Sequence, residues 1–523
     1  MIRVGLVLLL LASPAVAEGG GTLRLLARSA AGTIDPQVNY TAQYWQLFCF
    51  LYDGLVAFRK VPGKAGMELV PDLAEAVPAA AEGGLSYRFR LRRGVRFSDG
   101  RAVRPADVVA SFRRIFRVRS PTADTFYGAI EGAADCLKRP ADCVLPGVSA
   151  EGDEIVIRLS RPEPEFLIRL ALPHASVVPE DAPGEDVGTG VLAGTGPYVI
   201  THYDPGEGIR IERNPHFREW SAEAQPAGVP DRIDYEFGLE DEAEVTAVEN
   251  GQADWMFDTP PVDRLGELGE RFLSQVHLSP AFALWFVPLN VHLAPFDDVR
   301  VRQAFNMAVD RAAVVKLFGG RAMAEATCQV LPPGLEGYAV YCPYPRDLAR
   351  ARDLVREAGV VGQRVTLVTD DAPVSRAIGV YLRDVLADLG FEARVRSLSG
   401  NVQFPYIQNS NNRVQASLTT WYADYPSAGN FLLGVFGCGA FHPGSDASPN
   451  ISGFCEPALD ARVMEGIARG DWGEVAAVDR AVTDLAPAVV LFAPRYIDVV
   501  SRRVGDYAYH EVFRWLIDRA SVH

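Results

Sequence analysis

The sequence predicts an α/β protein of two or three domains, and three observations lead to this prediction. The chain has 523 residues, which is too long for one hydrophobic core. Residues 345–397 alternate between helical and strand patterns, as a βαβ arrangement does. Residues 418–422 are β-formers and continue this alternation as a further strand.

Strands in the N-terminal half are predicted by alternating apolar and polar residues. Tyr87, Phe89 and Leu91 alternate with arginines, which is typical of a half-buried strand. Similar patterns predict strands at 22–26, 154–159, 209–212 and 233–237. A helix is predicted from Pro105, because proline suits the first helical position and Asp107 then lies near the positive end of the helix dipole.

The pattern changes near residue 281. Residues 283–290 predict a strand, and Asp297 or Asp298 can cap the helix that follows it. Asp310 can cap a second helix. Residues 345–397 follow as helix, strand, helix and strand, and a last strand is expected at 488–492.

The N-terminus predicts export. Arg3 gives a positive start, residues 4–12 are apolar, and Ala15-Val16-Ala17 forms a cleavage site before Glu18. Residues 1–17 are therefore predicted to be a signal peptide. The first cysteine lies far from this site, at position 49, so no lipid anchor is indicated. We expect a soluble protein in the periplasmic space or outside the cell.

Charge and motif content argue against several functions. The formal net charge of −15 disfavours binding to nucleic acid or to an anionic membrane surface. The sequence has no C-x-x-C motif and no histidines at ligand spacing, so neither a metal nor a cofactor is expected. It also lacks G-x-S-x-G and H-E-x-x-H, which gives a secreted hydrolase no support. The acid pair Glu163/Glu165 lies in a proline-rich loop and is interpreted as solvated.

Six of the seven cysteines form close pairs in the sequence, namely Cys136/Cys143, Cys328/Cys342 and Cys438/Cys455. Export makes disulfides possible, although sequence alone leaves their connectivity open. We expect local pairing, because each pair brackets a loop rich in proline or glycine. Each such disulfide should stabilise the fold by roughly 2–3 kcal/mol. Cys49, in an apolar run, is expected to be a buried free thiol.

The main candidate for a binding site is the stretch from Leu418 to Pro426. A strand here would present Trp421 and Asp424 at its end, where α/β proteins commonly bind ligands. An indole attracts a cation, and a carboxylate forms a charge-assisted hydrogen bond with it. The pair therefore favours a cationic or amine-bearing ligand. The alternative is a core tryptophan beside an aspartate that starts a turn.

Four blocks of the sequence together resemble the extracellular solute-binding proteins of family 5, the dipeptide- and oligopeptide-binding type that serves ABC importers. They are the strand, the G-V-x-F-x-D-G turn and the helix within 87–112, the G-T-G-P-Y turn at 194–198 with Asn214-Pro215, the stretch 294–311, and Trp421-Tyr-Ala-Asp424-Tyr-Pro. The resemblance extends over nearly all of 22–510, in the order of the family.

This resemblance implies a two-lobed periplasmic-binding-protein fold of type II, in which two hinge crossovers join two α/β lobes around a closing cleft. The first lobe would comprise 18–60, 185–281 and 488–523, with an extra subdomain at 61–184. The second lobe would comprise 282–487. The crossovers would lie near 279–287 and 484–492.

The resemblance also suggests site residues. Asp424 corresponds to the acid that holds a peptide's amino group. The other implied ligand-binding residues are Trp421, Tyr422, Tyr40, Thr41, Gln43 and Phe492. Four positions depart from the family pattern. Leu418 stands where some members have arginine, and Ser427-Ala428 where others have Asp-Pro. Arg104 replaces a small capping residue, which loses about 1 kcal/mol of helix capping.

The resemblance implies a non-enzymatic, monomeric binding protein that delivers a small solute to an ABC permease in the inner membrane. Peptides are one class of solute in this family, which also imports opines, sugars and nickel complexes. Two alternatives remain at this point. One is a secreted hydrolase, and the other is a sensor or chaperone that uses the same fold without transport.

Overall fold

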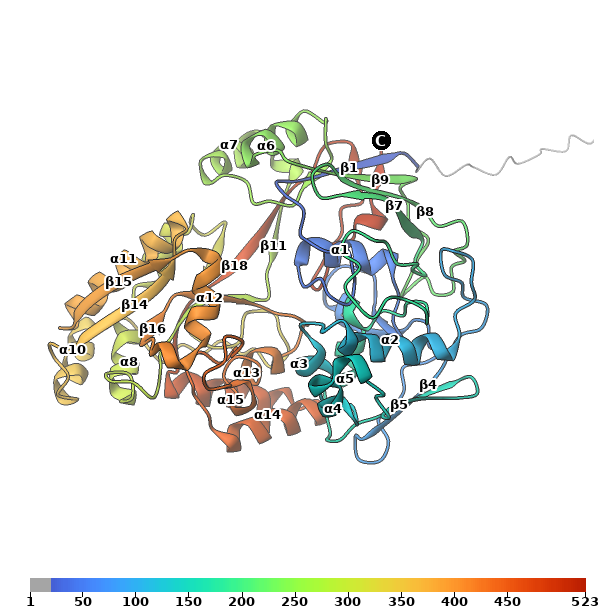
Figure 1. Ribbon diagram of the computed structural model, residues 1–523. Helices are drawn as coiled ribbons and strands as arrows, with labels where there is room; N and C mark the ends of the chain where they lie inside the picture. The colour runs from blue at the N-terminus through green and yellow to red at the C-terminus, as the bar shows by residue number, and fades with distance from the viewer. Residues whose placement is uncertain (1–19) are drawn as a thin grey trace, which may run out of the picture.

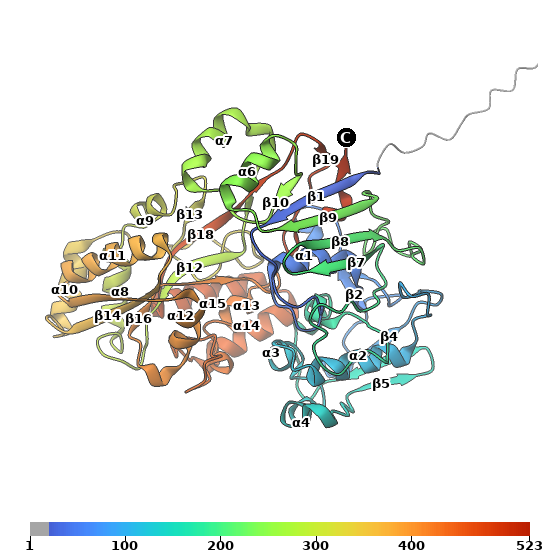
Figure 2. The same ribbon diagram turned by 45° about the horizontal axis from the view of Figure 1, so that its top comes forward.

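The structure is a computed structural model that describes residues 20–523 as two lobes (Figures 1 and 2). The predicted signal peptide and its cleavage site lie outside the described residues. We call lobe I the part that contains the first strand and both ends of the described chain. Lobe II is the part coloured yellow to orange in Figure 1. Long strands run between the two lobes.

Lobe I is built on a five-stranded sheet. Its spatial order is β10 (Trp255–Met256), β1 (Thr22–Ala27), β9 (Arg232–Phe237), β8 (Gly208–Arg213) and β7 (Tyr198–Asp204). Strand β1 is parallel to β10 and β9, whereas β7, β8 and β9 are antiparallel. Helix α1 (Ala42–Leu51) packs beside β7. The strands predicted at 22–26, 209–212 and 233–237 are confirmed.

A smaller sheet in lobe I contains β4 (Ser86–Arg90), β6 (Glu154–Arg158) and β5 (Val148–Glu151), all antiparallel. Strand β4 buries Tyr87 and Phe89 and exposes Arg88 and Arg90, as its alternation predicts. Four helices accompany this sheet: α2 (Pro105–Arg117), α3 (Ala123–Tyr127), α4 (Ala133–Lys138) and α5 (Phe166–Leu170). Two short strands, β2 (Val56–Phe58) and β3 (Leu69–Pro71), pair nearby.

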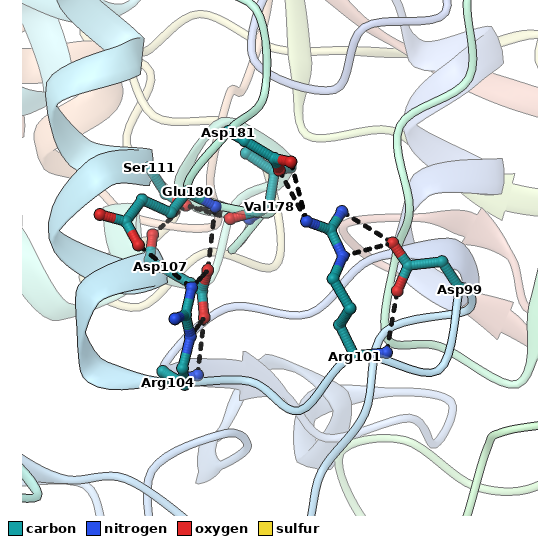
Figure 3. A network of polar contacts seen from close by, with 8 residues as sticks. All are labelled: Asp99, Arg101, Arg104, Asp107, Ser111, Val178, Glu180 and Asp181. Atoms are coloured by element: carbon teal, nitrogen blue, oxygen red, sulfur yellow. Dashed lines mark hydrogen bonds and ion pairs between the residues drawn. The ribbon is translucent and has the colours of Figure 1, made fainter.

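Asp107 partly replaces the capping residue that position 104 lacks. Its carboxylate accepts hydrogen bonds from the backbone N–H groups of Arg104 at 2.7 Å and Glu180 at 2.9 Å (Figure 3). The first of these bonds is the acidic half of a capping box. One turn later, the Ser111 hydroxyl accepts the N–H of Val178 at 2.9 Å. The start of α2 is therefore fastened to the loop at 178–181, a long-range contact that the residues around position 104 do not indicate.

Lobe II contains a parallel sheet in the order β15 (Glu392–Leu398), β14 (Arg364–Asp370) and β16 (Ala416–Ser417). With α10 (Leu348–Glu357) and α11 (Pro373–Asp388), it confirms the predicted alternation of helix and strand. Its other helices are α8 (Val299–Ala308), α9 (Arg311–Leu317), α12 (Gly400–Gln408), α13 (Gly429–Leu432), α14 (Pro457–Arg469) and α15 (Trp472–Leu485). Asp298 and Asp310 cap α8 and α9.

A third sheet contains the strands that run between the lobes. Its order is β11 (Val276–Pro280), β18 (Ala488–Val499), β12 (Ala283–Pro288) and β17 (Thr419–Tyr422), and β13 (Ala324–Ala326) also pairs with β18. Strand β18 pairs with β12 through its first residues and with β11 through its last. In both figures β18 extends from lobe II toward lobe I.

The strand at 418–422 joins a different sheet from the one expected. Only Ala416 and Ser417 pair with β14, and from Thr419 the chain pairs with β12 instead. The backbone N–H of Leu418 still donates to Val368 at 2.8 Å, so the change of sheet occurs at that residue. The expectation that this strand continues the βαβ alternation is therefore wrong. Composition marks a strand, but the choice of neighbour depends on long-range packing.

The three local disulfides are confirmed as Cys136–Cys143, Cys328–Cys342 and Cys438–Cys455. Cys49 is free, as expected, but half-buried rather than fully buried. Burial raises the pKa of its thiol to about 12, so it is protonated at neutral pH. Among residues 20–523, no helix has the length and apolar character needed to cross a membrane.

Candidate functional site

Asp424 lies where lobe II contacts lobe I. It follows β17, and its carboxylate accepts a hydrogen bond from the Tyr40 hydroxyl of lobe I. The side-chain N–H of Asn430 donates to its other oxygen at 2.9 Å. Asn430 is the second residue of α13 (Gly429–Leu432) and is 3% exposed, so it is held firmly in place. One carboxylate thus receives a donor from each lobe.

Alternation along β17 separates the residues around Asp424 into two faces. Trp421 and Ala423 pack against the hydrophobic cluster that contains Phe282 and Phe286. Tyr422 is two residues before Asp424 and so points to the same, opposite face. Its ring lies 6.2 Å from that of Tyr496. The indole N–H of Trp421 donates to the Asn430 side-chain oxygen at 2.9 Å. The structure therefore joins Trp421 to Asp424 through Asn430.

Two exposed tyrosines lie beside Asp424. Tyr40 is 44% exposed and Tyr422 is 45% exposed, yet burial raises the pKa of both phenols. These two facts are compatible when a side chain is open to water on one side and surrounded by protein on the others. Both rings therefore present part of their surface to solvent next to the Asp424 carboxylate.

Asp424 forms no direct ion pair within residues 20–523, and the more distant charge of Arg169 only partly opposes the effect of its burial. Burial raises the pKa of its carboxyl, and the hydrogen bonds from Asn430 and Tyr40 oppose this shift. None of the ion pairs formed within residues 20–523 includes Asp424. A desolvated carboxylate held by two neutral donors can accept a cation, because pairing offsets the cost of its burial.

A second group of polar contacts joins the lobes close to Asp424. Tyr425 donates its hydroxyl to Glu165 of lobe I at 3.0 Å, and the Ser427 hydroxyl donates to the other oxygen of Glu165. Glu165 is only 2% exposed. The interpretation of Glu165 as a solvated loop residue is therefore wrong. It precedes α5, and the opposite lobe covers it, which local sequence cannot indicate.

The remaining predicted residues have different surroundings. Thr41 is half-buried, and its backbone and hydroxyl both donate to Asn39. Gln43 is 7% exposed and donates to the backbone oxygen of Ser29 at 3.1 Å. Both residues support the loop that carries Tyr40. Phe492 is fully buried and packs against the core ring of Trp285, so the structure does not bring it to this surface.

Two groups near the site were not predicted. Asn430 positions Asp424, but an asparagine at the start of a short helix gives no distinct sequence signal. His174 lies under Tyr40, with ring centroids 5.5 Å apart, and burial lowers its pKa to about 3. It is therefore a neutral aromatic support and supplies no charge to the site at neutral pH. No cluster of three or more His, Cys, Asp or Glu in residues 20–523 is placed to hold a metal ion.

Residues 68–442 match the family described as bacterial extracellular solute-binding proteins, family 5 Middle. This match covers more than half of the 523 residues. The chain belongs to this family. The resemblance found in the four sequence blocks is thereby confirmed, and the site between the lobes lies in a family of solute-binding proteins rather than enzymes.

Relatives of this family 5 protein cover most of its length. "Di/tripeptide-binding protein 2" of Pseudomonas aeruginosa (strain UCBPP-PA14) is 25% identical, with 97% of this chain and 96% of the relative covered. "Probable di/tripeptide-binding protein 5" of the same strain is 27% identical over 76% of each chain. The solved structure of "Clavulanic acid biosynthesis oligopeptide binding protein 2" has a TM-score of 0.88 and 24% identity, with 97% of this chain and 96% of that chain covered. That likeness confirms the two-lobed binding-protein fold.

Proposed function

We propose that this protein is the periplasmic solute-binding component of an ABC importer, and that its solutes are peptides or related small compounds with a free amine. Family membership supports a binding function. The names of the two Pseudomonas relatives favour short peptides as the class of solute. The protein would close on the solute and then deliver it to the permease in the inner membrane as a monomer.

The unpaired carboxylate of Asp424 is the main reason to propose a solute with an amine. It is desolvated, receives one donor from each lobe, and takes part in no ion pair within the described chain. An ammonium group can supply both the missing positive charge and additional hydrogen-bond donors. A peptide is a common biological solute that carries an ammonium group at its N-terminus, next to the polar groups of its backbone.

The other site residues have distinct proposed roles. Tyr40 and Tyr422 offer exposed aromatic surface beside Asp424. Trp421 fixes Asn430 and lines the same region from behind. Thr41 and Gln43 keep the Tyr40 loop in place. Phe492, being fully buried, would act only through the packing of β18.

Closing requires two lobes that rotate as units about the strands between them. We assign residues 18–60, 185–281 and 488–523 to lobe I, residues 61–184 to its subdomain, and residues 282–487 to lobe II. Strands β11 and β12 support a hinge near 279–287, whereas β18 changes partner from β12 to β11 between Phe492 and Arg495, at the far end of the second proposed hinge, 484–492. A solute that touches both lobes would favour the closed arrangement.

Isothermal titration with trialanine and with N-acetyl-trialanine tests the proposed class of solute. The two peptides differ in the ammonium group, which acetylation removes. We expect heat of binding for trialanine and a much weaker response for the acetylated peptide. Equal affinity for both peptides would contradict the role of the amine, and no binding of either would contradict the assignment to short peptides.

A further inference from the structure

Tyr425 belongs to lobe II, yet its side chain lies within the hydrophobic core of lobe I. It is 4% exposed and is part of the core cluster that lobe I builds around α1, α2 and α3. Its ring lies 5.8 Å from that of Phe126, and the guanidinium of Arg169 lies 5.4 Å from its ring centroid. A residue of one lobe is therefore inserted into the other.

Polar groups of lobe I receive the Tyr425 hydroxyl. The hydroxyl donates to Glu165 at 3.0 Å and accepts from Arg169 at 3.1 Å. Ser427 donates to the second oxygen of Glu165. Arg169 also forms an ion pair with Glu163 at 3.3 Å, within lobe I. Opening the lobes would break the bonds of Tyr425 and Ser427, while the ion pairs of Arg169 would remain.

Gly429 allows this close approach. A Cβ atom at position 429 would lie 2.3 Å from one carboxylate oxygen of Glu165 and 2.5 Å from the other. Real Cβ atoms do not approach other atoms so closely, so any larger residue at position 429 must displace Glu165 or separate the lobes. Glycine at this place is explained by contact between the lobes, because helix α13 alone does not require it.

We infer that Tyr425 and Glu165 are positioning residues for solute binding, and that they form a latch that holds the two lobes closed. Tyr425 directly follows Asp424 in the chain. When the lobes close, the same movement therefore inserts Tyr425 into lobe I and brings the Asp424 carboxylate to Tyr40. The subdomain that carries Glu165 thereby takes part in binding without touching the solute. This inference rests on the proposed function, because retention of a solute is what the closed arrangement provides.

The first measurement is small-angle scattering of the full mature chain. It should be recorded on protein as purified, with any cargo, and again after unfolding and refolding to remove the cargo. We expect wild-type scattering to match the closed structure in at least one preparation. In that preparation, Tyr425→Ala and Gly429→Ala should increase the radius of gyration. Unchanged scattering in the folded variants, or a wild type that is never closed, would overturn the inference.

The second measurement is the rate at which trialanine dissociates. Tyr425→Ala should release it at least tenfold faster, because losses of this kind fall mainly on the off-rate. Tyr425→Phe keeps the ring and loses the two hydrogen bonds, so its effect should be smaller and in the same direction. Wild-type dissociation rates in both variants would count against the latch.

Tyr127→Phe is the matched control. Tyr127 is fully buried in lobe I, and its hydroxyl donates to the backbone oxygen of Arg169 at 3.1 Å, so its bond does not cross between lobes. It should leave both the radius of gyration and the dissociation rate unchanged, and an effect equal to that of Tyr425→Phe would overturn the latch. If trialanine does not bind the wild type, the peptide proposal fails while scattering still decides the latch.

Discussion

Replacing Asp424 by asparagine should remove solute binding while leaving the fold intact. The amide has nearly the same shape as the carboxylate. Its oxygen can still accept the N–H of Asn430, and its NH₂ can donate to the Tyr40 hydroxyl, which serves equally well as an acceptor. The network around position 424 is therefore preserved, and only the negative charge is lost.

The magnitude of the effect follows from the desolvation of Asp424. Burial already raises the pKa of its carboxyl, so the site pairs charges in a medium that water screens poorly. Removing one partner of such a pair leaves an ammonium buried and unpaired, which costs about 2–5 kcal/mol of binding free energy. This corresponds to a loss of roughly 30-fold to several-thousand-fold in affinity.

Isothermal titration with trialanine measures the effect, and thermal unfolding monitors the fold. Asp460→Asn is a matched control. Asp460 is also half-buried in lobe II, has a raised pKa because of burial, and accepts the N–H of Cys438 at 2.8 Å. It should bind as the wild type does. Wild-type affinity in Asp424→Asn would refute the reasoning, since Asp424 would then only shape the turn into Tyr425.

Three further predictions concern pH and packing. Because the pKa of Asp424 is raised, wild-type affinity for trialanine should fall as the pH drops from about 7 toward 4, and Asp424→Asn should lose this dependence. His174 has a pKa lowered to about 3, so below about pH 6.5 the unfolded chain binds a proton that the folded chain does not. The free energy of unfolding measured in urea should therefore fall as the pH drops below 6.5, by up to about 1.4 kcal/mol per unit, and His174→Phe should reduce that slope. A Cβ at Gly196 would lie 2.3 Å from the Phe50 backbone oxygen, so Gly196→Ala should lower the free energy of unfolding by about 2 kcal/mol or more. The control is Gly266→Ala, where the added Cβ has no atom within 4 Å and should not destabilise the protein. A smaller loss at Gly196 would contradict the stated contact.

Local patterns in the sequence predicted most of the secondary structure. Alternation marks Tyr87 and Phe89 as the buried side of β4, and Asp298 and Asp310 mark the starts of two helices. These signals depend on neighbours within a few residues, which the sequence displays directly. The pairing of Cys136 with Cys143 was accessible for the same reason, because its loop is short.

Features that depend on contact between distant segments were not predictable. Glu165 lies 262 residues from Ser427, its hydrogen-bond partner, and looks like a solvated loop residue in isolation. Likewise, nothing local indicates that the chain changes sheets at Leu418. The sequence predicted a site at Asp424, but its hydrogen bonds with Tyr40 and Asn430 depend on contact between the two lobes and on the fold of α13, which local patterns do not display.

Native mass spectrometry of freshly purified protein tests the central claim most directly, because a closed binding protein can retain its solute. We expect an added mass on the wild-type chain, less of it on Asp424→Asn, and a released compound that carries a primary amine. After acetylation of that amine, the compound should no longer rebind to the refolded wild type. A retained compound without a basic group, or equal rebinding after acetylation, would contradict an amine site at Asp424.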